Sequence, residues 1–167
     1  MFTHKIKYRY IFSIKGRINK MNRADKAVEL FNNNFNCSQA VFTVFATEYG
    51  ISEELALKLS TSFGGGARSG ELCGAVSGAL MVLGLKFGHY HAEDNEEKQK
   101  AYSLAKEFIK RFREANGSIV CRDLLGYDLT VEDDCKIINS KNLFKTICPK
   151  MVKSSVEIIE QILDEYK

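Results

Sequence analysis

The sequence predicts an all-α fold: a single compact bundle of about six or seven helices around a buried, glycine-rich central helix. The chain has 167 residues but only one proline, so it lacks the frequent turn signals of a many-stranded protein. Several long segments repeat their apolar residues at helical spacing. The length and the 45% hydrophobic content suit one domain with its own core.

Four helices are expected in the first half of the chain. Each starts at a residue able to cap a helix or at the cysteine-bearing segments, and each ends at a glycine or at an asparagine run. The expected ranges are 22–31, 37–49, 52–63 and 72–87. The fourth range contains few polar groups, which predicts burial on nearly all sides.

The second half adds four segments, which we expect at residues 93–115, 118–126, 130–138 and 149–166. The first is the longest helix. Thr130 and Asp133 resemble a capping box, and Pro149 suits the first turn of the last helix. The apolar stripe of the longest helix is a narrow seam typical of core packing. Its members are Ala101, Ala105, Phe108 and Phe112, with Tyr102 and Ile109 beside them.

Residues 1–20 differ in charge from the rest of the chain. They contain six Lys and Arg and no acidic residue, whereas residues 21–167 contain 18 Lys and Arg against 21 Asp and Glu. We interpret residues 1–20 as a basic N-terminal arm or as an extension upstream of a natural start at Met21. Residues 21–167 are then the single helical domain.

Charge and hydropathy exclude several function classes. The mildly acidic residues 21–167 offer no basic surface of the kind that nucleic-acid binding requires. The longest apolar stretch of the arm, Tyr10-Ile11-Phe12, is too short for a signal peptide, and the apolar range 72–87 is short for a membrane span. We therefore expect a cytoplasmic protein, in which reduced thiols act as ligands or redox centres more often than as bridges.

The chain has five cysteines, at positions 37, 73, 121, 135 and 148. Their spacing matches neither a zinc ribbon nor a thioredoxin-type site. Cys37, Cys73, Cys121 and Cys148 each fall in or just before the first turn of an expected helix, where the helix dipole favours a thiolate. If these helix starts converge, the four cysteines form a redox site or hold a soft metal or an iron–sulfur cluster, with Cys73 as the reactive thiolate. Cysteines also fill cores as small hydrophobes, so a structural role stays open.

Glycines lie on both sides of Cys73. The run before it leaves backbone N–H groups uncovered, and two glycines after it form a low ridge that a second helix, a second subunit or a cofactor can approach. Nucleotide binding ranks low, because the run lacks the Gly-Lys-Ser/Thr ending of a P-loop and follows no strand. The candidate cofactor contacts are Gly64, Gly65, Gly66, Gly74 and Gly78.

Two smaller signals accompany the cysteines. Arg68 is a candidate positive neighbour that would favour a Cys73 thiolate or an anionic ligand, although an exposed arginine without a partner explains it as well. His89 and His91 precede two carboxylates, but a solvated loop explains them better than a metal site does.

Six short motifs spread over the domain form a set. They are Asn36-Cys37-Ser38-Gln39-Ala40, Phe63-Gly64-Gly65-Gly66, Cys73-Gly74-Ala75-Val76-Ser77-Gly78, Leu83-Gly84-Leu85-Lys86-Phe87-Gly88, Arg111-Phe112 and Cys121-Arg122-Asp123-Leu124-Leu125-Gly126. Together they resemble the family named for its C-GCAxxG-C-C cysteine pattern, over about residues 24–163. The four cysteines of that name correspond to Cys37, Cys73, Cys121 and Cys148, which leaves Cys135 as an extra. The chain departs from the pattern where Leu72, and not a glycine, precedes Cys73.

The resemblance implies redox activity, which in that family is inferred from the cysteines, and a redox protein or a transporter as partner, because members are often encoded near transport genes. It assigns no reaction and no cofactor. The leading hypothesis is a redox-active protein that uses thiol–disulfide exchange or a bound metal or iron–sulfur centre. The alternatives are a non-enzymatic helical binding module with structural cysteines, which suits a homodimer, and a transporter accessory that touches the membrane with its basic arm.

Overall fold

A computed structural model describes residues 21–167, so the arm predicted for residues 1–20 lies outside the described residues. Apart from one isolated bridge, the regular structure of residues 21–167 is helical, which confirms the predicted all-α class. Seven of these helices have eight or more residues, in agreement with the expected six or seven. In residues 21–167, no helix has both the length and the apolar character that crossing a bilayer requires.

The helices follow one another through short connections. In chain order they are α1 (Arg23–Asn32), α2 (Cys37–Ala46), η1 (Thr47–Tyr49), α3 (Glu53–Ser60), η2 (Thr61–Phe63), η3 (Gly66–Gly70), α4 (Gly74–Phe87), α5 (Asn95–Asn116), α6 (Cys121–Leu125), α7 (Glu132–Ser140), α8 (Leu143–Thr146) and α9 (Cys148–Glu165).

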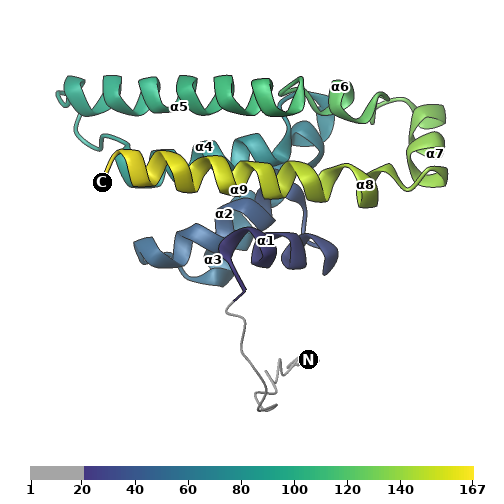
Figure 1. The fold of residues 1–167 in the computed structure, drawn as a ribbon, viewed down its shortest axis with the longest axis horizontal. Coiled ribbons are helices and arrows are strands. Elements are labelled where there is room, and N and C mark those ends of the chain that lie inside the picture. The colour runs from purple at the N-terminus through teal and green to yellow at the C-terminus, as the bar shows by residue number, and fades with distance from the viewer. Residues whose placement is uncertain (1–20) are drawn as a thin grey trace, which may run out of the picture.

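Helix α4 occupies the centre of the bundle, where it packs against α2, α5 and α9. Figure 1 shows the two long helices α5 and α9 running along the molecule, with α1, α2 and α3 on the side of α9 away from α5. The short helices α6, α7 and α8 connect the end of α5 to the start of α9 (Figure 1). The predicted central, glycine-rich helix is therefore α4.

Most helix ends follow the caps that the sequence predicts. The side chain of Asn22 accepts a hydrogen bond from the Asp25 amide at 2.7 Å and caps α1, and Gly50 takes a left-handed conformation after η1. The capping box expected at Thr130 and Asp133 is wrong. The Thr130 hydroxyl instead donates to the Asp128 carboxylate at 2.8 Å, so α7 begins without a side-chain cap.

The predicted apolar stripe of α5 agrees with the structure at its two phenylalanines and differs at Tyr102. Phe108 and Phe112 are fully buried as expected, but Leu104 is buried with them and Tyr102 is 51% exposed. The Tyr102 ring lies under the Lys98 ammonium on the surface of the helix, 6.0 Å from nitrogen to ring centre. The face of α5 that meets the bundle is thus rotated toward Leu104.

The small-residue ridge of α4 faces α2. A β-carbon on Gly78 would lie 2.8 Å from the carbonyl oxygen of Ser38 and 3.1 Å from the β-carbon of Val41. Of the three occupants that the sequence left open, a second helix of the same chain is therefore the one that lies against Gly78. Only a residue without a side chain lets the two backbones approach this closely.

Gly78→Ala is expected to destabilise the protein by about 1–3 kcal/mol, because the added methyl group overlaps the backbone of α2. Gly84 of the same helix provides a matched control, since nothing lies within 4 Å of the position that its β-carbon would occupy. Gly84→Ala should stabilise the protein by up to about 1 kcal/mol through helix propensity alone. Urea denaturation followed by circular dichroism measures both changes. Equal stabilisation by the two substitutions would contradict the close contact of α2 with α4.

Candidate functional site

The structure brings four of the five cysteines together at the starts of four helices. Cys37 is the first residue of α2, Cys121 of α6 and Cys148 of α9, and Cys73 directly precedes α4. All four side chains are buried, with at most 8% of their surface exposed. Every pair among the four thiols is close enough for one to shift the pKa of the other, which places them in one cluster. Residues far apart in the sequence thus form one group of thiols.

A capping box holds the helix start that carries Cys37. The Asn36 side chain accepts hydrogen bonds from the amides of Ser38 and Gln39 at 3.0 and 3.1 Å, and the Gln39 side chain accepts one from the Asn36 amide at 3.0 Å. The side-chain NH2 group of Asn36 also donates a hydrogen bond to the Thr61 carbonyl at 2.8 Å. These bonds fix the first turn of α2 and with it the backbone of Cys37.

A short antiparallel bridge aligns Cys73 with Cys121. The bridge joins Leu72 to Val120, and the amides of Cys73 and Cys121 donate to the carbonyls of Ile119 and Glu71 at 2.8 and 2.6 Å. Because neighbouring residues of a paired extended segment alternate in direction, Cys73 and Cys121 leave the bridge on the same face. Two backbone hydrogen bonds therefore position this half of the cluster.

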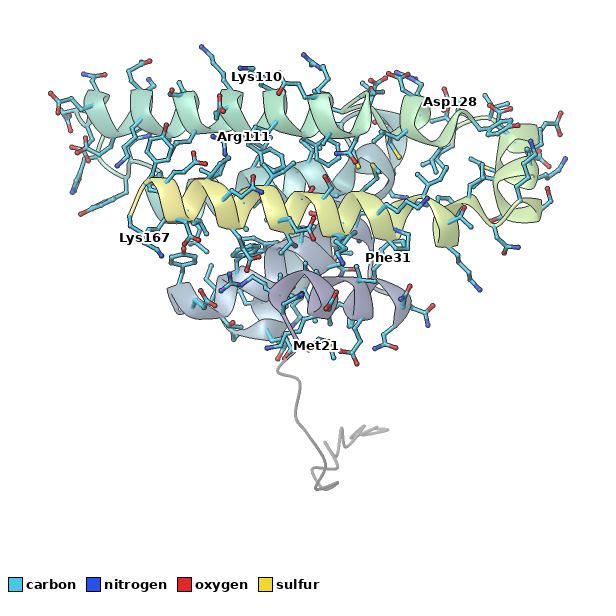
Figure 2. All side chains as sticks on the ribbon, viewed as in Figure 1. Met21, Phe31, Lys110, Arg111, Asp128 and Lys167 are labelled. Carbon is cyan, nitrogen blue, oxygen red and sulfur yellow. The ribbon has the colours of Figure 1, made fainter. Side chains whose placement is uncertain are left out.

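Cys37 and Cys148 form the other half of the cluster. Their thiols are hydrogen-bonded to each other, and among the four cysteines they are the only pair with such a bond. The two halves meet at Gly74, where an added β-carbon would lie 3.2 Å from the β-carbon of Cys37. Figure 2 shows sulfur atoms gathered near α6, close to the start of α9.

Burial dominates the acidity of Cys73 and Cys121. It raises the pKa of Cys73 to about 11, although hydrogen bonds from the backbone amides of Ala75 and Val76 act in the opposite direction. Burial, with the neighbouring thiols, raises the pKa of Cys121 to about 12. The sequence predicted an acidic Cys73 thiol from the helix dipole. The amides of α4 have the expected effect, but the cost of placing a charge in a buried site is larger.

The hydrogen bond between Cys37 and Cys148 shifts their pKa values in opposite directions. The bond from Cys37 stabilises a Cys148 thiolate and lowers the pKa of Cys148, and the same bond, followed by burial, raises the pKa of Cys37 well above the usual value. The first proton to leave the pair therefore comes from Cys148, while Cys37 stays protonated as its donor. Among the four thiols, only Cys148 has a lowered pKa.

Cys135 lies apart from this cluster. Its thiol is half-buried on α7 and donates a hydrogen bond to the Leu129 carbonyl at 3.0 Å. It exerts no effect on the pKa of any of the other four cysteines. The structure thus separates Cys135 from the four thiols that the sequence grouped.

The five candidate glycines pack against the chain itself or adopt left-handed conformations. Added β-carbons on Gly64 and Gly74 would collide with Asn36 and with the Phe63 carbonyl, at 2.5 and 3.0 Å, and one on Gly66 would lie 2.4 Å from the Glu71 amide. Packing within the domain explains these glycines, as it explains Gly78. Gly65 has a left-handed backbone conformation, with a φ of +64°. The predicted cofactor contact at these residues stays a prediction.

Sequence reasoning missed the left-handed turn that follows the glycine run. Gly65, Gly66, Ala67 and Arg68 all have φ between 52° and 64°, a conformation that is rare for residues with side chains. The turn brings Arg68 near Cys121, where its charge lowers the pKa of that thiol against the larger effect of burial. The sequence predicted such a neighbour for Cys73. The glycines signalled an unusual backbone, but nothing in the sequence indicated that Ala67 and Arg68 would continue it.

The cluster does not have the geometry of a metal site. In the part of the chain from residue 21 onward, no three His, Cys, Asp or Glu side chains are arranged so that they could hold a metal ion, either at the four thiols or at His89 and His91. The predicted metal or iron–sulfur ligation therefore gains no support from this arrangement.

We expect Cys148 to ionise below the usual thiol pKa of about 8.5, because Cys37 donates to its thiolate. Ultraviolet absorbance of the thiolate, followed as pH rises, should reveal one early ionisation in the reduced protein. Cys37→Ala should move that ionisation to higher pH, and Cys148→Ser should remove it. Cys73→Ser is the control and should leave it unchanged, since the Cys73 pKa of about 11 lies far above this range. An early ionisation that survives Cys148→Ser would contradict the assignment.

Comparison with known families gives one match, and comparison with curated proteins and with solved structures gives none. The family model described as "Putative redox-active protein (C_GCAxxG_C_C)" matches residues 35–162, a range that begins two residues before Cys37 and contains all four clustered cysteines. The match covers most of the chain and agrees with the resemblance read from the motifs. The chain therefore belongs to the C_GCAxxG_C_C family.

Proposed function

We propose that this protein is a thiol–disulfide redox protein whose working groups are the four clustered cysteines. The single observation that carries the proposal is the convergence of four helix starts on one buried group of thiols, two of which are hydrogen-bonded to each other. Cysteines that only fill a core have no need to meet in one place. Membership of a family described as redox-active supports the same conclusion.

The reaction is a two-electron exchange with a disulfide. Two protein thiols give up two protons and two electrons and form one S–S bond, and the S–S bond of the co-substrate is reduced to two thiols. Cys37 and Cys148 are the pair best suited to this step, because their sulfurs already contact each other through a hydrogen bond. Cys73 and Cys121 are a second pair that can accept the disulfide by internal exchange.

The co-substrate disulfide must reach thiols that are buried. The helices α6 and α8, which have five and four residues, lie at Cys121 and shortly before Cys148. Helices this short have little stability of their own, so they are the elements expected to open first. We expect the reduced form in a reducing compartment such as the cytoplasm, with a redox protein or a transporter as the partner.

Oxidation of the reduced protein with diamide should convert the four clustered thiols to disulfides and leave Cys135 free. Counting thiols before and after oxidation, and mapping the linked peptides by mass spectrometry, measures this. Cys37→Ser and Cys148→Ser should each prevent the disulfide between these two residues. Cys135→Ser is the matched control, because it removes a cysteine outside the cluster, and it should leave the number of disulfides unchanged.

Two outcomes would overturn the proposal. If diamide forms no disulfide among the four residues and each Cys→Ser variant changes only stability, the cysteines are structural parts of a binding module. If protein purified without oxygen holds iron or zinc in stoichiometric amount, and Cys73→Ser or Cys121→Ser releases it, the cluster is a metal centre. Metal analysis and a visible absorption spectrum decide the second case.

A further inference from the structure

An open groove lies beside the two segments that lead into Cys37 and Cys148. It has a volume of about 510 Å³, which is in the range of small-molecule sites. On one side it is lined by the end of α1 and the following loop, up to Asn36, the residue before Cys37. On the other side Phe144 and Lys145 of α8 line it, four and three residues before Cys148. Both halves of the hydrogen-bonded pair are therefore carried by segments that form this groove.

The lining combines aromatic surface with unpaired polar groups. Phe31, which is labelled in Figure 2, and Phe35 contribute partly buried rings. Asn32 and Asn34 present exposed amide groups between them. Lys145 is exposed and has no carboxylate partner within the described residues 21–167.

The side chains that line the groove favour a ligand with particular chemical groups. An unpaired ammonium attracts a carboxylate, free amides hydrogen-bond to peptide groups, and phenylalanine rings cover an apolar linker. Seven residues line the groove, far fewer than the roughly 20–30 that each side of a stable protein interface contributes, which favours a small molecule over a protein. The buried thiols of Cys37 and Cys148 follow these two lining segments along the chain, which adds the requirement for a sulfur atom that can be attacked.

We propose that this groove binds a low-molecular-weight peptidic disulfide that carries carboxylates, and that it presents the disulfide to Cys148, with Cys37 as the resolving thiol. The inference rests on the proposed function, because it names the substrate class of the same cysteines. Lys145 acts as a specificity-determining residue that holds a carboxylate of the disulfide.

The reaction has two balanced steps. The Cys148 thiolate attacks one sulfur of the bound disulfide, the S–S bond breaks, and the first substrate thiol leaves and takes up a proton while a mixed disulfide forms on Cys148. Cys37 then loses its proton and attacks the Cys148 sulfur, which releases the second substrate thiol and leaves a Cys37–Cys148 disulfide. The substrate gains two electrons and two protons, and the protein dithiol loses them.

Glutathione disulfide and cystamine are the two probes that test this inference on the reduced, full-length protein. Both are small disulfides, but only the first carries carboxylates. Lys145→Gln should slow mixed-disulfide formation with glutathione disulfide about threefold, the effect of one exposed charge pair, and should not slow the reaction with cystamine. Lys110→Gln, an exposed lysine on α5 labelled in Figure 2, is the matched control and should change neither rate.

The position of the adduct provides the second measurement. In Cys37→Ser, which cannot resolve the mixed disulfide, peptide mapping should find the glutathione adduct on Cys148, provided that circular dichroism of the variant matches the wild type. An adduct on another cysteine, or equal slowing of both probes by Lys145→Gln, would overturn the inference. If diamide still forms the Cys37–Cys148 disulfide in that case, only the groove assignment fails. If diamide forms none, the proposed function fails first.

Discussion

The close contact between α2 and α4 at Gly78 is the constraint on which the cluster depends. The backbone of Ser38 lies against Gly78, and Ser38 directly follows Cys37. Cys73 directly precedes the first turn of the same α4 helix. The distance between the two helix axes therefore also sets the separation of two of the four thiols. A side chain at Gly78 would move α2 outward and carry Cys37 with it, so packing of the core and assembly of the cluster are one geometric requirement.

Burial gives the four thiols unequal roles. A helix start favours a thiolate, but a buried site disfavours any charge, and at Cys73 and Cys121 burial has the larger effect. At Cys148 a hydrogen bond from a neighbouring thiol reverses the balance. The cluster thus holds one thiol with a lowered pKa and three with a raised pKa. In the proposed exchange, this asymmetry makes Cys148 the attacking sulfur and leaves the other thiols to resolve the mixed disulfide.

The apolar core, with a few ion pairs at its edge, holds the helix that carries Cys148. Helix α9 packs against α1, α4 and α5. Arg23 of α1 bonds to Glu160 at 2.8 Å, and Arg111 of α5 binds the two oxygens of Glu165 at 2.9 and 2.7 Å. Exposed ion pairs contribute little each, about 0–1 kcal/mol, so the buried face of α9 supplies most of its stability. The pairs join α9 to α1 and α5 at the edge of that buried face.

The helical class, most helix ends and the placement of four cysteines at helix starts follow from the sequence alone. Those features depend on local chemistry: Asn22 and Ser52 cap helices whatever surrounds them, and Gly50 ends one. Which two thiols share a hydrogen bond, which thiol has a lowered pKa, and the position of Arg68 near Cys121 depend instead on the tertiary structure. These properties depend on the distance between residues remote in the chain and on how much water each sulfur loses, and neither quantity can be read from spacing along the sequence.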